Sequence, residues 1–174
     1  SGDYYDASDE ELVRERDYAK NLIFEFNHTI PSDKEKRREI ISRLIKAKGS
    51  FHIEAPFYCD YGYNIEVGEN FYVNHGCIIL DVNKVQIGNN VLLGPNVQIY
   101  TAAHPIDPAE RLTGKEFAKP IVIGDNVWIG GGTIICPGVK IGNNVTIGAG
   151  SVVTKDIPDN VVAVGNPCKV IRKL

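Results

Sequence analysis

The chain has 174 residues, of which 43% are hydrophobic and 24% are charged, and its formal net charge is −3. These values are typical of one globular domain, and without a basic stripe they argue against nucleic acid as a partner. No apolar run approaches the roughly 20 residues that a membrane-spanning helix needs, and we recognise no signal peptide. The four cysteines are widely spaced and form no CxxC pair, so we expect reduced thiols in a cytoplasmic protein.

Residues 1–50 show helical patterning in two segments. Ser8 with Glu11, and Ser32 with Glu35, match the capping-box pattern, so each pair predicts the start of a helix. Apolar residues then recur at helical spacing: Leu12, Ala19, Leu22, Ile23 and Phe26 in the first segment, and Ile40, Ile41, Leu44 and Ile45 in the second. We expect two amphipathic helices.

Residues 51–100 carry aliphatic residues six positions apart, with one two-residue slip within residues 80–84. The series is Val67, Val73, Ile79, Ile87, Leu93 and Ile99. Polar and aromatic residues interrupt it in three segments: 59–64, 71–75 and 80–82. Two explanations stay open for these residues: side-chain ladders or hydrogen-bonded turns at corners of the fold, or contacts with a ligand.

Residues 101–120 break the repeat. Long loops inside a compact repeat are uncommon and tend to be functional. This one contains His104 directly before Pro105, which favours an extended backbone at His104. A histidine in a loop is more often a bystander than a catalyst, but its place in the one large interruption makes His104 a candidate.

Residues 121–153 repeat with a period of six. Aliphatic residues stand at Ile123, Ile129, Ile135, Ile141, Ile147 and Val153, and glycine follows four of them, at Gly124, Gly130, Gly142 and Gly148. This period fits neither a helix nor an ordinary strand. It predicts short strands joined by tight bends, stacked so that the aliphatic residues form an inner column, as in a parallel β-helix.

The predicted fold is therefore mainly β, with three parts. Residues 1–50 form a helical cap over one open end of the coil stack, and residues 51–168 form the β-helix of hexapeptide repeats, with an inserted loop at 101–120. Residues 169–174 form a basic tail.

The repeat resembles that of the hexapeptide-repeat acyltransferases, and the likeness sharpens over nearly the whole chain to the maltose and galactoside O-acetyltransferase group. The segments that carry it are 26–28 (FNH), 60–62 (DYG), 71–74 (FYVN), 100–105 (YTAAHP), 127–131 (VWIGG), 148–158 (GAGSVVTKDIP) and 165–167 (GNP). Segments 59–65 and 104–108 are more similar to the maltose branch. Galactoside enzymes tend to have serine at the position of Asp60 and an acidic residue at that of Val82.

The resemblance implies a left-handed β-helix, a homotrimer with active sites between subunits, and acetyl-CoA as co-substrate with no metal requirement. It implies that His104 is the general base that takes the proton of an acceptor hydroxyl, since histidine commonly serves this role near neutral pH. Asn74 matches a residue near the reacting centre, where its amide would hold the oxyanion or orient the acceptor. The positions that match sugar contacts are Asp6, Asp60, Tyr72, Asn74 and Asp81.

The resemblance also implies a coenzyme A site along the coils. The matching positions are Gly131, Ala149, Thr154, Lys155, Lys169 and Arg172. Small residues would let the pantetheine arm lie against the backbone, and the cations would meet phosphates. Simple repeat sterics would equally explain Gly131 and Ala149. Trp128 would either wall this slot or pack against a neighbouring subunit.

Three alternatives to a maltose-like or glucose-like acceptor remain from the sequence. The same chemistry would serve another hydroxyl acceptor: a galactoside, an antibiotic or other xenobiotic, or serine. A metal hydratase similar to γ-type carbonic anhydrase needs three histidines, whereas only His75 and His104 lie in the recognised repeats. The third alternative is a β-helix that serves as a non-catalytic scaffold.

Overall fold

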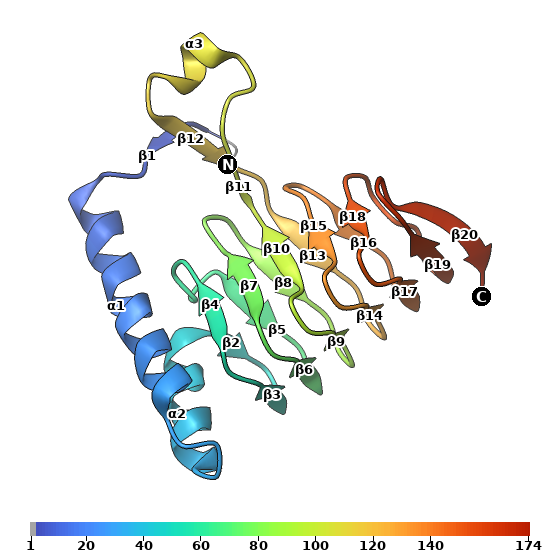
Figure 1. Ribbon diagram of the computed structural model, residues 1–174, viewed down its shortest axis with the longest axis horizontal. Coiled ribbons are helices and arrows are strands. Elements are labelled where there is room, and N and C mark those ends of the chain that lie inside the picture. Colours follow the sequence, from blue (N-terminus) through green and yellow to red (C-terminus); the bar gives the residue numbers. More distant parts are fainter. Residues whose placement is uncertain (1–2) are drawn as a thin grey trace.

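The computed structural model describes residues 3–174 and shows a parallel β-helix with three flat walls and two helices at its N-terminal end (Figure 1). Wall 1 contains β2 (Lys46–Ala47), β5 (Ile65–Val67), β8 (Val85–Ile87), β13 (Ile121–Ile123) and β16 (Lys140–Ile141). Wall 2 contains β3 (Phe51–Ile53), β6 (Phe71–Val73), β9 (Leu92–Leu93), β14 (Trp128–Ile129), β17 (Val145–Ile147), β19 (Val161–Val164) and β20 (Lys169–Lys173). Wall 3 contains β4 (Phe57–Cys59), β7 (Cys77–Leu80), β10 (Gln98–Tyr100), β15 (Ile134–Ile135) and β18 (Val152–Val153).

The hexapeptide positions build the core as the sequence predicts. Each aliphatic residue from Ile123 to Val153 in steps of six has at most 2% of its surface exposed. The residues four positions after five of them are also buried: Val127, Thr133, Val139, Val145 and Ser151. Two inward positions per wall thus fill the inside of the coil, and neighbouring coils pair in parallel along each wall.

Glycine and asparagine share the corner between walls 1 and 2. A Cβ on Gly124 would lie 2.9 Å from the carbonyl oxygen of Gly142 on the next coil, so close coil approach requires glycine there. Two residues later the backbone has positive φ, and asparagine occupies those positions: Asn70, Asn90, Asn126, Asn144 and Asn160. Each of the first four donates a side-chain amide hydrogen bond to the next, at 2.8–3.0 Å. The ladder residues Asn70 and Asn90 lie outside segments 59–64, 71–75 and 80–82, so the ladder does not decide between the two explanations for those segments.

All changes in coil length lie at the corner between walls 3 and 1. Equivalent residues are 18 apart in the regular coils, as Asp125 and Asn143 are. The spacing is 20 across each of the first two coils, 36 across the coil that contains residues 101–120, and 16 across the last coil. The extra residues of the first two coils fall in segments 60–64 and 81–84. The sequence analysis expected only the insertion within residues 80–84, and the structure shows a second one at 60–64.

The inserted segment at 101–120 has structure of its own. It contains β11 (Ala102–Ala103), α3 (Pro108–Arg111) and β12 (Lys115–Ala118). β12 pairs antiparallel with β11 on one side and with β1 (Tyr5–Asp6) on the other. The N-terminal strand therefore lies on the insertion, beside the coil stack (Figure 1).

Both predicted helices are present, but each begins one residue later than its capping-box pattern indicates. α1 is Glu10–His28 and α2 is Lys34–Leu44, and their N-caps are Asp9 and Asp33. The Asp9 carboxylate accepts from the backbone N–H groups of the first helical turn. An aspartate accepts such bonds as well as serine does, so the start moves to it.

The helices cover the N-terminal end of the stack, which confirms their role as a cap (Figure 1). Asn27 replaces a strand partner for β4, since its side chain accepts from Phe57 N–H at 2.9 Å and donates to Phe57 C=O at 3.0 Å. Unpaired strand edges invite association with other chains, and this contact closes one. Within residues 3–174 we find no helix with the length and apolarity to cross a membrane.

The asparagine ladder gives a first prediction. Asn126→Ala loses two ladder bonds and keeps a positive φ that alanine disfavours, so we expect its free energy of unfolding to fall by about 2–3 kcal/mol. Asn126→Gly loses the same two bonds, but glycine adopts a positive φ without strain. The free energy of unfolding of Asn126→Gly should therefore fall by about 1 kcal/mol less than that of Asn126→Ala. Urea denaturation measures both. Equal losses would contradict the backbone contribution.

Candidate active site

The predicted site residues gather at two corners of the coil stack. Asn74, Gly131 and Ala149 lie at the corner between walls 2 and 3, which we call the amide corner. The second group lies at the corner between walls 3 and 1, which we call the histidine corner: Asp60, Asp81, His104, Thr154 and Lys155.

His104 stands at the histidine corner, just after β11. Its side chain is 58% exposed, and its Nε2 lies 3.8 Å from Glu116 Oε1 on β12. The other carboxylate oxygen of Glu116 accepts from the Tyr5 hydroxyl at 2.6 Å. Burial, followed by this hydrogen bond, raises the pKa of Tyr5, so the phenol stays a neutral donor. Glu116 is thereby fixed on one side and free to orient the imidazole on the other.

Helix α1 also reaches the histidine corner. Arg16 donates to the Tyr61 hydroxyl at 2.7 Å and to the Ala7 carbonyl at 2.6 Å, which ties the N-terminal segment to the coil. Asp60 lies in the same neighbourhood and is half-buried. Burial raises the pKa of Asp60, and the charge of Arg16 opposes that rise. The helical cap is therefore part of the site's surroundings.

Asp81 is completely buried. Its Oδ1 accepts from the backbone N–H groups of Asp60 and Tyr61, at 3.1 and 2.9 Å, and its Oδ2 accepts from that of Asn64 at 3.3 Å. A sugar has no access to this carboxylate in the described chain. Asp81 instead fixes the loop that carries Asp60, which argues against the direct substrate contact that the resemblance implied.

Asp6 lies on β1, where it pairs in register with Lys115 of the insertion. Its carboxylate is exposed and accepts from the backbone N–H and hydroxyl of Ser8, at 2.8 and 2.7 Å. These bonds lower the pKa of Asp6. The strand pairing brings Asp6 to the same insertion as His104, although the two residues are 98 positions apart in the sequence.

Asn74 follows β6 at the amide corner. Its Oδ1 accepts from the backbone N–H of His75 at 2.7 Å. No other described residue bonds the side-chain amide, so Nδ2 keeps both of its hydrogens for a ligand. Tyr72, two residues earlier, points outward from wall 2 and stacks on His52 with ring centroids 5.5 Å apart.

The two small residues predicted to contact coenzyme A, Gly131 and Ala149, lie at the amide corner on later coils than Asn74. Gly150 N–H donates to the Gly131 carbonyl, so Gly131 and Ala149 occupy equivalent places on successive coils. Lys169 lies on β20 opposite Val164, towards the same corner. Thr154 and Lys155 follow β18 at the histidine corner, and Arg172 lies on wall 2. Trp128 is 55% exposed on that wall, between Leu92 and Thr146.

Wall 3 separates the two corners within one chain. A wall 3 strand such as β7 has four residues, which span roughly 13 Å. Asn74 and His104 stand on opposite sides of that wall and on different coils. One chain therefore presents two half-sites that do not face each other.

Three residues around the histidine corner escaped the sequence reasoning: Tyr5, Arg16 and Glu116. Glu116 was within the interrupted segment, but no repeat position marked it. Tyr5 and Arg16 come from the segment interpreted as a cap. The pairing of β1 with β12 brings Tyr5 to Glu116, and α1 brings Arg16 to Tyr61.

Metal-ligand geometry is not assembled in the described chain. Residues 3–174 contain no group of three or more His, Cys, Asp or Glu side chains placed to hold a metal ion. The structure adds His52 on β3 to the histidines of the coils, where the sequence analysis counted only His75 and His104. His52 lies on wall 2, and His75 and His104 lie at different corners, so the three do not form the set that the hydratase alternative requires.

Two protein-family models match this chain, one over the N-terminal cap and one over the later coils. Residues 1–49 match the maltose acetyltransferase hexapeptide capping motif, and residues 120–155 match the bacterial transferase hexapeptide of six repeats. The galactoside O-acetyltransferase of Escherichia coli strain K12 is 46% identical over 95% of this chain and 82% of its own length. The chain belongs to the maltose and galactoside O-acetyltransferase group. It is thus an acyltransferase of the hexapeptide-repeat type.

Solved structures of this group superpose closely on the chain. A maltose O-acetyltransferase from Clostridium difficile 630 is 59% identical, with a TM-score of 0.98 over 99% of this chain and 93% of that one. A galactoside acetyltransferase in complex with coenzyme A is 46% identical, with a TM-score of 0.96 over 99% and 86%. These similarities confirm the left-handed parallel β-helix with N-terminal helices.

Asp81 gives a prediction for the pH dependence of stability in this acetyltransferase. Burial raises the pKa of Asp81 from 3.8 to about 6, so the folded chain holds this proton more tightly than the unfolded chain does. The resulting stability is present below pH ~4 and is lost as the pH rises through about 6. Relative to Asp81→Asn, which does not titrate, wild type should lose roughly 3 kcal/mol of unfolding free energy over that range.

Urea denaturation of wild type and Asp81→Asn at several pH values between 4 and 7.5 measures this difference. The variant should be less stable at every acid pH, since an amide cannot accept all three backbone bonds. A wild-type-to-variant difference that stays constant with pH would contradict the titration of Asp81.

Proposed function

We propose that this acyltransferase moves the acetyl group of acetyl-CoA to a hydroxyl of a maltose-like or glucose-like sugar. Membership in the O-acetyltransferase group supports the reaction, and a relative solved with coenzyme A supports the donor. The observation that carries the proposal is His104, exposed beside Glu116 in the one large insertion of a strict repeat. The similarity of segments 59–65 and 104–108 to the maltose branch supports the acceptor class.

The proposed reaction is a direct transfer without an acyl-enzyme. The acceptor oxygen attacks the thioester carbonyl carbon while His104 takes the hydroxyl proton. The tetrahedral intermediate then collapses, the carbon–sulfur bond breaks, and the imidazolium returns the proton to the coenzyme A thiolate. The products are an acetyl ester and the free thiol. The chemistry requires no metal.

Asn74 is proposed to stabilise the oxyanion. The bond from His75 N–H to Oδ1 fixes the amide orientation and leaves Nδ2 as the outward donor. A preorganised donor aimed at developing charge stabilises the transition state more than the ground state. Glu116 is proposed to position His104 and to stabilise its imidazolium, and Tyr5 holds Glu116 in turn.

The proposed acceptor contacts are Asp60, Tyr72 and Asp6, with Asp81 as the residue that positions Asp60. Coenzyme A is proposed to lie beside Gly131 and Ala149 of one copy, where the small side chains leave the backbone accessible, with Thr154 contributed by the histidine corner of a neighbouring copy. Lys155, Lys169 and Arg172 are exposed cations suited to its phosphates.

The division between two corners supports a homotrimer. Because Asn74 and His104 stand on opposite sides of wall 3, a complete site needs the amide corner of one copy against the histidine corner of another. An interface between two different surfaces of the same chain closes into a ring when the rotation allows it, and a prism with three walls suits threefold closure.

The first test of the mechanism replaces His104 and Glu116. His104→Ala should lower kcat by roughly 10²–10⁴ while leaving the protein folded, because the side chain is exposed. Glu116→Gln should lower kcat less, with little change in KM for acetyl-CoA, and Glu110→Gln, an exposed acid in the same insertion, should match wild type. Near-normal kcat in His104→Ala would refute the mechanism.

The second test mixes two inactive variants. Asn74→Ala and His104→Ala are unfolded together in equal amounts and refolded as mixed oligomers. If each site takes Asn74 from one copy and His104 from another, about a quarter of the wild-type activity should return. Each variant refolded alone is the control. No recovery in a mixture that sediments as trimers would contradict the shared site.

The acceptor class is tested by measuring thiol release from acetyl-CoA against maltose, glucose, galactosides, serine and hydroxyl-bearing antibiotics. We expect the highest kcat/KM with maltose or glucose. Transfer to one of the others alone would keep the reaction and replace the acceptor. No release with any acceptor would favour the non-catalytic scaffold.

A further inference from the structure

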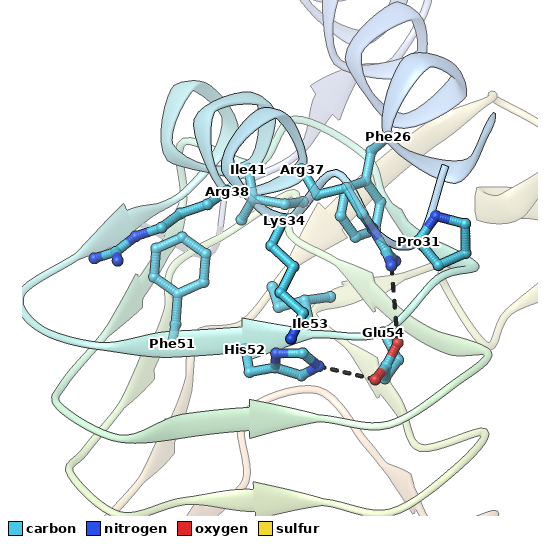
Figure 2. Close-up of a pocket in the computed structure, with 10 residues that line it drawn as sticks. All are labelled: Phe26, Pro31, Lys34, Arg37, Arg38, Ile41, Phe51, His52, Ile53 and Glu54. Carbon is cyan, nitrogen blue, oxygen red and sulfur yellow. Dashed lines mark hydrogen bonds and ion pairs between the residues drawn. The ribbon is translucent and has the colours of Figure 1, made fainter. Parts of the chain in front are cut away.

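A cavity of about 330 Å³ lies between the cap and the first coil, and its residue Glu54 stands at the amide corner, one coil before Asn74. Figure 2 shows Lys34, Arg37 and Arg38 reaching down from α2 toward Phe51, His52 and Glu54 on and just after β3. Phe26, Pro31, Ile41 and Ile53 complete an apolar lining. A cavity of about 150 Å³ holds benzene, so this one has room for a ring with a substituent.

The charges around the cavity do not balance. Three cations, Lys34, Arg37 and Arg38, face one carboxylate, Glu54. The hydrogen bond from His52, with Nε2 2.8 Å from Oε1, holds the pKa of Glu54 below its usual range, so Glu54 is ionised. Its other oxygen is 4.0 Å from Arg37 Nη1, too far for a hydrogen bond, so the two charges attract each other only weakly.

Arg37 is the most constrained of the three cations. Its side chain is 11% exposed, and its Cζ lies over the Phe26 ring, 4.8 Å from the ring centre. Its Nε and Nη2 are buried and have no hydrogen-bond partner in residues 3–174. A buried charge that is weakly compensated is costly, and a nearby anion would relieve that cost. Since those two nitrogens are covered, Arg37 acts on the cavity through its charge.

The position of the cations on α2 adds to this cost. Lys34 is three residues before Arg37 and four before Arg38, so like charges are neighbours on one face of the helix. They also stand in its first turn and a half, where the helix dipole disfavours cations and favours anions. Packing alone accounts for Arg37 on Phe26 and Arg38 over Phe51, but not for three cations around an open cavity.

We propose that this cavity binds a small organic anion: an aromatic or aliphatic body against Phe26, Ile41 and Phe51, and a phosphate or carboxylate against Lys34 and Arg38. His52 lies between this cavity and Tyr72, one of the proposed acceptor contacts on wall 2, because the two rings stack on each other. The anion is therefore either a separate ligand or a charged substituent of the acceptor. The second source rests on the proposed function; the binding site itself does not.

The binding test uses phenyl phosphate and the full chain, with saturating coenzyme A present so that the coenzyme's own site is not counted. Titration calorimetry should give saturable binding that benzyl alcohol does not reproduce. The double variant Lys34→Gln, Arg38→Gln should bind at least roughly tenfold more weakly. Arg43→Gln, on the same helix but outside the cavity, should bind as wild type does. Absent binding in wild type, or equal weakening by Arg43→Gln, would overturn the proposal.

The source test compares acetyl transfer to phenyl β-glucoside and 4-carboxyphenyl β-glucoside. If the anion belongs to the acceptor, wild type should prefer the charged glucoside, and the double variant should lose that preference. If it is a separate ligand, the two glucosides should react alike while phenyl phosphate still binds. Failure of both glucosides to react counts against the proposed acceptor and leaves the calorimetric result to decide the site.

Discussion

The close approach of one coil to the next is the constraint on which this structure depends. Each strand satisfies its backbone groups with the coils before and after it, so neighbouring coils must follow the same path. At the corner between walls 1 and 2 the contact is so tight that a side chain on Gly88 or Gly124 would collide with the backbone of the next coil. The asparagine ladder then links those corners from coil to coil. Together these contacts fix the number of residues at this corner, so coil length does not vary there.

Variation is confined to the corner between walls 3 and 1 for the same reason. Extra residues there leave the three walls in register, because they bulge outward before the next wall 1 strand begins. Segments 60–64 and 81–84 stack on each other, and Asp81 joins them through three backbone hydrogen bonds. The insertion at 101–120 leaves from this corner too. The regular coils thus provide the scaffold, and the irregular corner carries His104.

The cap has more than one role in this arrangement. It closes the open end of the stack through Asn27, as a solenoid requires. The segment before it brings Tyr5 to Glu116, and α1 brings Arg16 to Tyr61. On its other side, α2 forms the basic cavity over β3. End closure, orientation of the candidate base and a candidate anion site therefore share two helices and one short strand.

The sequence by itself determined the β-helix, since a period of six admits no helix or ordinary strand and needs no long-range information. It also determined the starts of the two helices to within a residue, and it singled out His104 because a break in a strict repeat is visible in one dimension. What only the tertiary structure decided depends on contacts between distant segments. Asp81 was predicted to meet a sugar, but the stacking of two loops buries it. Glu116 and Tyr5 are more than a hundred positions apart, and only the pairing of β1 with β12 joins them, because no local pattern encodes which strand covers an insertion.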